Sequence, residues 1–303
     1  TGVDLNGQAK CPRWEQFLVE VFDGDEALVR YVHKAAGYSL TGDTREPALF
    51  LCHGGGRNGK STLLNILRAM LGGYACNTPF STFRKEDHGG IPNDVAALAG
   101  KRLVTASEAP ESSLNEDRVK VMTGTDAITA RFLHGEYFSF QPTGHVWLAM
   151  NHKPRIVGTD DGIWSRVKLI PFQVSFLGRE DKALLGALMA ELPGILAWAV
   201  RGCLLWQAEG LGEAEAVRVA TLAYREESDN VGRFVADCCT LQPGARVTAA
   251  ALRAAYEAWA AESGEHTLAR GPRWGERLAQ MGCTQERVFS GGRQTRGWRG
   301  IGL

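Results

Sequence analysis

The feature that most constrains the fold is a glycine-rich segment, residues 54–61, which reads GGGRNGKS and fits G-x-x-x-x-G-K-[ST] at every fixed position. An apolar stretch, residues 48–52, precedes it, and a stretch with Leu63, Leu67 and Leu71 on one helical stripe follows. Glycines let backbone N–H groups turn inward around a phosphate, and the N-terminus of a helix adds partial positive charge. The sequence therefore predicts a strand, a phosphate-binding loop and a helix in succession.

The residue types in this loop suggest individual roles. Lys60 is expected to reach the β- and γ-phosphates of a nucleoside triphosphate, and the Ser61 hydroxyl is expected to hold Mg²⁺. We therefore predict a nucleoside triphosphate and Mg²⁺ as ligands, with the nucleotide held by Gly54, Gly55, Gly56, Arg57, Asn58, Gly59, Lys60, Ser61 and Thr62.

Three polar residues accompany strand candidates further along the chain. Glu108 follows residues 102–106 and is the candidate that polarises the attacking water and binds metal, although an acid after a strand is as often structural. Asn151 ends the strand candidate 146–150, where a neighbouring strand would meet the γ-phosphate. Arg166 stands just before residues 167–170, from where an arginine could reach the nucleotide of a neighbouring subunit.

The chain divides by pattern into four segments. Residues 1–46 carry apolar residues at helical spacing, and residues 47–172 alternate short strands with helices, which is typical of an α/β core with a buried sheet. Residues 173–228 return to helix, with a break expected at 210–212. Residues 229–303 contain two predicted helices, 249–263 and 273–281, and a small β-ribbon, the pattern of a winged helix.

Charge is unevenly distributed along a chain whose 34 basic and 34 acidic residues balance. From residue 266 onward seven arginines stand against two glutamates, a balance of +5 that leaves −5 on the remainder. Such a tail favours contact with DNA through Arg273, Arg293 and Arg296. A solvated arginine-rich surface is the competing interpretation.

The lengths of the apolar stretches and the pattern of cysteines indicate in which cellular compartment the protein is expected. No apolar stretch reaches the length of a membrane span, so we expect no membrane partner. The seven cysteines contain no CxxC pair, which predicts buried thiols in a reducing cytoplasm and neither a zinc site nor a disulfide framework.

In their order along the chain, these motifs resemble the superfamily 3 helicases, specifically the ATPase half of the primase-helicases of phages, plasmids and poxviruses. The matching stretches are residues 37–42, 54–62, 106–108, 123–131, 151–154 with Ile156, 162–172 and 296–301. The resemblance implies a P-loop, AAA+-like core with a parallel sheet, a helical collar before it and a winged-helix-like domain after it. It also implies a homo-oligomeric ring, commonly a hexamer, with ATP between subunits and single-stranded DNA in the channel. A primase domain or partner is implied as well, and because residue 1 is not methionine we expect the native reading frame to extend upstream.

The resemblance carries roles onto single positions. Lys60 and Ser61 match the Walker A pair, Glu108 the catalytic acid of Walker B, Asn151 the sensor asparagine, and Arg166 the arginine finger. Walker B often has two acids, but here it reads Ser107-Glu108, so metal binding would depend more on Ser61 and water.

Further roles concern the subunit boundary and DNA. Lys120, with Arg45 as a weaker candidate, matches a cation that reaches across that boundary. Residues 128–141 match a DNA-contacting β-hairpin, with His134 at its turn and Tyr137 placed to stack on bases. This turn carries one histidine and one glutamate in place of several lysines, so its phosphate contact would be mainly a hydrogen bond. His145 is a further candidate for facing the channel.

The leading hypothesis is an ATP-driven ring translocase, a helicase that unwinds forked duplex DNA during replication of a phage or mobile element in a bacterial cytoplasm. The alternative is an ATP-gated DNA clamp or replication initiator without processive unwinding, which the single acid and the sparse hairpin charge keep open. A P-loop kinase for small molecules fits poorly, because it explains neither the arginine finger nor the basic tail.

Overall fold

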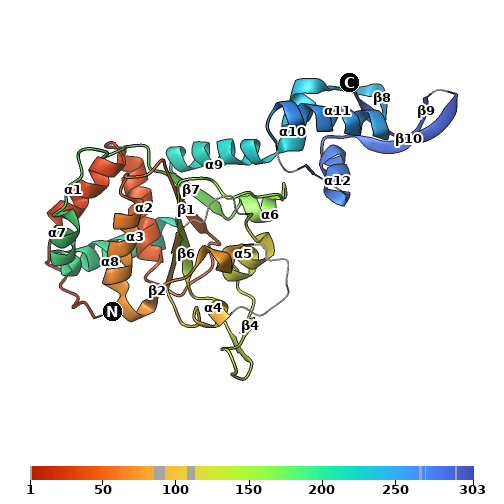
Figure 1. Cartoon of the computed structure of the whole chain (residues 1–303). Coiled ribbons are helices and arrows are strands. Elements are labelled where there is room, and N and C mark those ends of the chain that lie inside the picture. Colours follow the sequence, from red (N-terminus) through yellow and green to blue (C-terminus); the bar gives the residue numbers. More distant parts are fainter. Residues whose placement is uncertain (1, 85–92, 108–112, 266–267, 270, 291) are drawn as a thin grey trace. The chain divides into compact units, whose positions relative to one another are not determined.

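The computed structural model describes residues 2–84, 93–107, 113–265, 268–269, 271–290 and 292–303. Internal contacts divide the chain into two units, Thr1–Leu222 and Ala223–Leu303, which we describe one at a time (Figure 1). The division falls inside helix α9, Glu215–Ser228, a few residues before the expected boundary at residue 229.

The first unit is built on a five-stranded sheet with the order β2-β3-β6-β1-β7, in which all neighbours pair in parallel. Its strands are β1 Leu49–His53, β2 Ala75–Asn77, β3 Leu103–Ser107, β6 His145–Met150 and β7 Val167–Pro171. The predicted α/β core with a parallel sheet is confirmed, and the four predicted strands match β1, β3, β6 and β7. Strand β1, which leads into the glycine-rich loop, lies between β6 and β7, so residues following three strands meet beside this loop.

Helices cover both faces of this sheet (Figure 1). One face carries α1 Pro12–Val21, α2 Glu26–Tyr38, α3 Lys60–Leu71, α7 Leu184–Ala190 and α8 Leu192–Glu209. The other carries α5 Glu116–Met122 and the single-turn α6 Asp161–Trp164, and shorter pieces are η1 Gly72–Tyr74, η2 Phe80–Phe83 and α4 Asn93–Ala96. Trp14 and Phe17 of α1 are buried in the same core cluster as Phe50 of β1 and Trp198 of α8. Apolar burial therefore fixes the N-terminal helices beside the loop.

A two-stranded hairpin stands out from the body of this unit (Figure 1). Strands β4, Ile128–Ala130, and β5, Phe138–Phe140, pair antiparallel with Ile128 opposite Phe140. The hairpin predicted for residues 128–141 is therefore present.

The second unit contains the two predicted helices and the predicted β-ribbon, preceded by a helix and a strand that were not predicted. It comprises α10 Asn230–Cys238, β8 Thr240–Thr248, α11 Ala249–Glu262, α12 Pro272–Gln280, β9 Thr284–Ser290 and β10 Arg293–Gly302. The three strands form an antiparallel sheet in the order β8-β10-β9. Its core is aromatic, with the Tyr256 ring 5.3 Å from Phe234 and 4.6 Å from Trp274.

The structure bears on two expectations, the one about membrane-spanning helices and the one about cysteines. Within the described ranges, no helix alone is long and apolar enough to cross a membrane, and the bent pair α7–α8 passes that test on length and composition only. All seven cysteines are free thiols, but Cys238 is exposed and Cys76, Cys203 and Cys239 are half-buried. The expectation that the thiols are all buried was wrong. Cys76 lies in β2, the edge strand of the sheet, Cys203 lies in α8, and Cys238 and Cys239 lie at the end of α10.

Candidate nucleotide site

The loop between β1 and α3 requires glycine at two positions for different reasons. A Cβ on Gly54 would lie 2.2 Å from the Phe172 carbonyl oxygen, and one on Gly59 would lie 2.6 Å from Cγ1 of Val21 in α1. Gly59 also has a positive φ of 87° where α3 begins. Close packing and backbone conformation therefore both hold the loop against its neighbours.

The Lys60 ammonium is held at the carboxyl edge of the sheet. It donates to the Gly54 carbonyl oxygen at 2.7 Å, to Oδ1 of Asn58 at 2.8 Å and to Oδ1 of Asn151 at 3.0 Å. The side chain is only 5% exposed. A buried cation with fixed direction at a helix N-terminus is suited to binding the terminal phosphates of a nucleotide.

Asn58 connects the loop to β7, a contact that no pattern in the sequence indicates. Its side chain is buried, and its Nδ2 donates to the Phe172 carbonyl oxygen at 3.1 Å. Asn58 and Asn151 thus hold Lys60 from loop and strand, as expected for residues placed where β1 and β6 both end.

The residues fit Mg²⁺ only in part within the described chain. Ser61 is exposed in the first turn of α3, where its hydroxyl is available to a metal beside the phosphates. No group of three His, Cys, Asp or Glu residues that could hold a metal occurs in the described ranges. Mg²⁺ commonly takes few protein ligands together with substrate phosphates, so the Ser61 hydroxyl is suited to be one of them. Glu108, the predicted acid, lies outside the described residues.

A cavity of about 320 Å³ lies next to the loop, lined by Phe17, Gly59, Thr62, Phe176, Arg179 and Leu184 among others. The Arg179 guanidinium lies 5.9 Å from the Phe176 ring, and Arg57 pairs with Glu180. Backbone hydrogen bonds and the bond from Arg57 hold the pKa of Glu180 below its ordinary value, so the pair is charged at neutral pH. Sequence reasoning missed this cavity, because Phe17 and Phe176 are far apart in the chain and each resembles a core aromatic.

Arg166 lies at the opposite end of the sheet from the loop of its own chain. The Leu49 amide, at the start of β1, donates to the Arg166 carbonyl oxygen at 2.7 Å, whereas the loop follows His53 at the end of β1. From Leu49 to His53 the chain advances by four residues, so the two ends of β1 are about 13 Å apart. Within one chain, Arg166 and Lys60 are therefore not brought together.

Arg166 and Lys120 do lie near each other. Lys120 pairs with Asp160 at 3.2 Å, and a Cβ on Gly162 would lie 3.6 Å from its ammonium. Arg166 donates to the Gly162 carbonyl oxygen, and its buried Nε finds no hydrogen-bond partner in the described ranges. Burial would raise the pKa of Asp160, but the hydrogen bond and charge of Lys120 outweigh it and hold that pKa below its usual value. Arg45, the weaker candidate, is exposed and pairs with Asp43 at 2.5 Å.

The hairpin presents the residues that were predicted to contact DNA. His134 is exposed with a φ of 62°, and Tyr137 is 55% exposed with the Arg131 guanidinium 4.9 Å from its ring. Phe132 stacks on Phe138 with ring centroids 5.8 Å apart, so these two rings support the hairpin.

His145 is buried inside the first unit, which corrects the expectation that it faces a channel. Its side chain is 4% exposed and lies 4.0 Å from the Tyr38 ring. Burial lowers its pKa to about 4, so it is neutral at pH 7.

The arginines of the basic tail include some that are bound by other protein groups and some that are exposed without an ion pair. Arg277 is bound by Asp229 at 2.5 Å, and Arg299 donates to the Pro243 carbonyl oxygen at 3.2 Å, so both are structural. Arg273, Arg293 and Arg296, the predicted DNA contacts, are exposed and make no ion pair within the described ranges.

Comparison with known proteins finds relatives among viral replication proteins. Residues 52–166 match the model of a family of unknown function, DUF5906. The chain is 27% identical over 281 residues to "Putative helicase 022R" of Frog virus 3 (isolate Goorha), which covers 85% of this chain and 29% of that protein. It is 31% identical over 141 residues to "Putative primase C962R" of African swine fever virus (strain Badajoz 1971 Vero-adapted), which covers 45% of this chain and 15% of that protein.

These viral proteins are distant homologues, and the chain spans less than a third of their length. Among solved structures, the NrS-1 C-terminal region aligns with 97% of this chain and 76% of that chain, with a TM-score of 0.59 at 12% identity. That likeness shows a shared fold.

Proposed function

We propose that this chain is an ATP-hydrolysing DNA translocase, a helicase of the superfamily 3 type, that acts in replication as a ring of identical subunits. The observation that carries the proposal is the position of Lys60, held by Asn58 and Asn151 at the carboxyl edge of a parallel sheet. The distant homologues named as helicases and a primase support a role in replication.

The ring is supported by where the cations lie. Arg166 and Lys120 lie together, about 13 Å or more from the loop of their own chain, since the length of β1 separates the two ends. They can act on a γ-phosphate only if a second subunit brings its loop to them. An arginine supplied in this way stabilises the charge that develops on the transferred phosphoryl group.

The nucleotide would lie along the loop with its phosphates at Lys60 and its base in the cavity beside Gly59 and Thr62. Phe176 and Phe17 offer apolar walls to the base there. Asn151 would orient groups at the γ-phosphate, and Ser61 would hold Mg²⁺, which when bound neutralises charge on the phosphates.

Motion on DNA would come from the exposed β4–β5 hairpin, whose His134 and Tyr137 contact the strand. Loss of the γ-phosphate would release the contact with the neighbouring Arg166 and shift the hairpin along the strand.

Strand displacement on a forked duplex tests this function. We expect displacement with ATP and none with a non-hydrolysable analogue or with Lys60→Ala. Tight ATP-dependent binding of the fork without displacement would replace the translocase by the clamp or initiator, which the sparse hairpin charge favours.

A further inference from the structure

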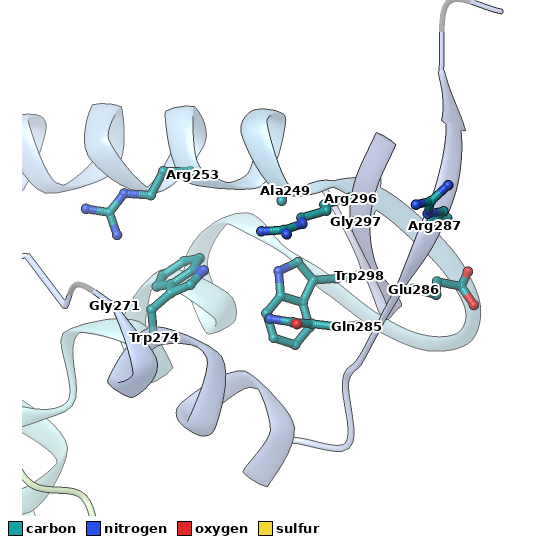
Figure 2. Close-up of a pocket in the computed structure, with 10 residues that line it drawn as sticks. All are labelled: Ala249, Arg253, Gly271, Trp274, Gln285, Glu286, Arg287, Arg296, Gly297 and Trp298. Carbon is teal, nitrogen blue, oxygen red and sulfur yellow. The ribbon is translucent and has the colours of Figure 1, made fainter. Parts of the chain in front are cut away.

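A second cavity, of about 690 Å³, lies within the C-terminal unit (Figure 2). It opens between the start of α11, the start of α12 and the β9–β10 hairpin. Its main lining residues are Arg253, Trp274, Gln285, Arg287, Arg296 and Trp298.

The inner wall of this cavity consists of residues that are buried or already bound by other protein groups. Arg253 lies 5.6 Å from the Trp274 ring and donates to the Ala269 carbonyl oxygen at 2.6 Å, while Glu257 pairs with it at 2.7 Å. Trp274 and Trp298 are 9% and 4% exposed. Arg253 is therefore part of the wall and is already bound. The side chains of the β9–β10 hairpin are the groups that remain available to a ligand.

The hairpin sets two arginines directly opposite each other. Arg287 and Arg296 are register partners in the antiparallel pair, so their side chains share a face with Gln285 and Trp298. Like charges opposed in this way destabilise a sheet. Neither guanidinium has an ion pair or hydrogen bond with a protein group in the described ranges.

The carboxylate of this hairpin is already paired with another arginine. Glu286 also lines the cavity, but it alternates with Arg287 along β9 and pairs with Arg246 of β8 at 2.6 Å. This face therefore presents two cations, each of which is suited to a phosphate.

An aromatic ring continues the same face. Phe289 lies two residues beyond Arg287, about 7 Å along the strand and on the same side of it. It is 72% exposed, although an exposed phenylalanine gains nothing from water. Paired cations followed by an exposed ring are the groups that proteins use to bind a single strand, by its phosphates and by stacking on its bases.

We propose that the β9–β10 hairpin binds single-stranded DNA, with Arg287 and Arg296 on its backbone phosphates at the mouth of the cavity and Phe289 stacked on a base. The proposal rests on the proposed function only in taking DNA as the ligand, because neither ATP nor Lys60 is needed for this contact. It adds Arg287 and Phe289 to the DNA contacts, neither of which the basic tail alone distinguished.

The test is binding of a fluorescent oligothymidylate to the full chain by anisotropy, without nucleotide, across a salt series. We expect Arg287→Ala with Arg296→Ala to weaken binding and to lower the slope of log K against log salt by about 0.7 for each phosphate that the protein no longer neutralises. Phe289→Ala should weaken binding about tenfold and Phe289→Tyr should restore it. All three side chains are exposed, so none of these variants should unfold at a lower temperature than wild type.

Matched controls make the outcome decisive. Arg218→Ala removes one charge from α9, where Glu215 pairs with Arg218, and it should leave the salt slope unchanged. Affinity and slope unchanged in the arginine variants, or a weakening equal to that of Arg218→Ala, would overturn the proposal. An equal weakening with a duplex of the same length would also overturn it, in favour of a duplex contact.

The same measurement in Lys60→Ala separates this proposal from the proposed function. Binding that persists in Lys60→Ala and falls in the hairpin variants supports the hairpin site, whatever the translocase assay gives. Wild-type binding by the hairpin variants, with displacement and ATP hydrolysis intact, would remove the hairpin site and leave the translocase standing.

Discussion

The Lys60 ammonium lies 3.0 Å from Oδ1 of Asn151, which joins the start of α3 to the end of β6 across the centre of the sheet. This contact fixes a cation and a neutral amide at the place where the γ-phosphate of a bound nucleotide would lie. Its consequences for turnover can be tested directly.

Asn151→Leu should lower the kcat for ATP about a hundredfold, because the variant lacks one group that orients the transferred phosphoryl. Binding of a non-hydrolysable analogue should change less than tenfold, since Lys60 keeps its bonds to Gly54 and Asn58. Steady-state hydrolysis and analogue titration measure the two effects. Equal reductions in both would show that Asn151 acts only in binding.

Gly54→Ala should lower the free energy of unfolding by about 1–3 kcal/mol, because its Cβ would lie 2.2 Å from the Phe172 oxygen. Gly55→Ala is the matched control, since a Cβ there meets nothing within 4 Å. Its unfolding free energy should stay within about 0.5 kcal/mol of wild type. Denaturant unfolding compares them, and equal stability of the two variants contradicts the packing of the loop.

Arg166→Ala should abolish ATP hydrolysis in a pure preparation while leaving the nucleotide bound, because under the proposed function the arginine acts on another chain's nucleotide. Mixing it with inactive Lys60→Ala subunits should restore part of the activity at subunit contacts that keep both groups. Hydrolysis is followed as the ratio of the two is varied. No recovery of activity at any ratio would show that Arg166 does not act on the nucleotide of a neighbouring chain.

Phe176→Ala should weaken ATP-analogue binding about tenfold, because the cavity beside Gly59 loses an aromatic wall. Leu177→Ala is its control, since Leu177 is 69% exposed on the next position and does not line the cavity. Inorganic triphosphate, which has no base, should bind both variants alike. Weaker triphosphate binding in Phe176→Ala would show that the loop itself had moved.

His145 should make the first unit acid-sensitive. Its pKa is lowered from 6.5 to about 4 by burial, so the unfolded chain binds a proton that the folded chain does not. Its contribution is fully present above about pH 6.5 and is lost progressively as the pH falls to about 4, a loss of about 3 kcal/mol. Urea midpoints at pH 7 and pH 5 measure it, and His145→Gln should reduce the difference between them.

Sequence alone predicted the core because its strands are apolar runs bounded by glycine and polar residues. It missed β2, which has three residues, only partly buried, and carries no pattern. The misplacement of His145 has a similar cause: in a parallel strand buried on both faces, alternation does not separate inside from outside. Tyr38, which covers His145, comes from a helix more than a hundred residues earlier.

The sequence predicted those candidate site residues whose positions follow from a motif. It did not predict those whose environment depends on contacts between distant parts of the chain. Lys60 and Asn151 meet because the strands that carry them are parallel neighbours, a relation that polarity at strand ends can indicate. Nothing in the order of residues distinguishes Arg277, bound by Asp229, from Arg296, which keeps its charge exposed. Such distinctions need the folded chain.

The register that sets Leu49 beside Val167 has a consequence for enzyme kinetics. Arg166 precedes that end of the sheet and Lys60 follows the other, so under the proposed function an isolated chain would hold only half of each reaction centre. Specific activity should therefore rise with protein concentration and vanish on dilution, even when ATP is saturating.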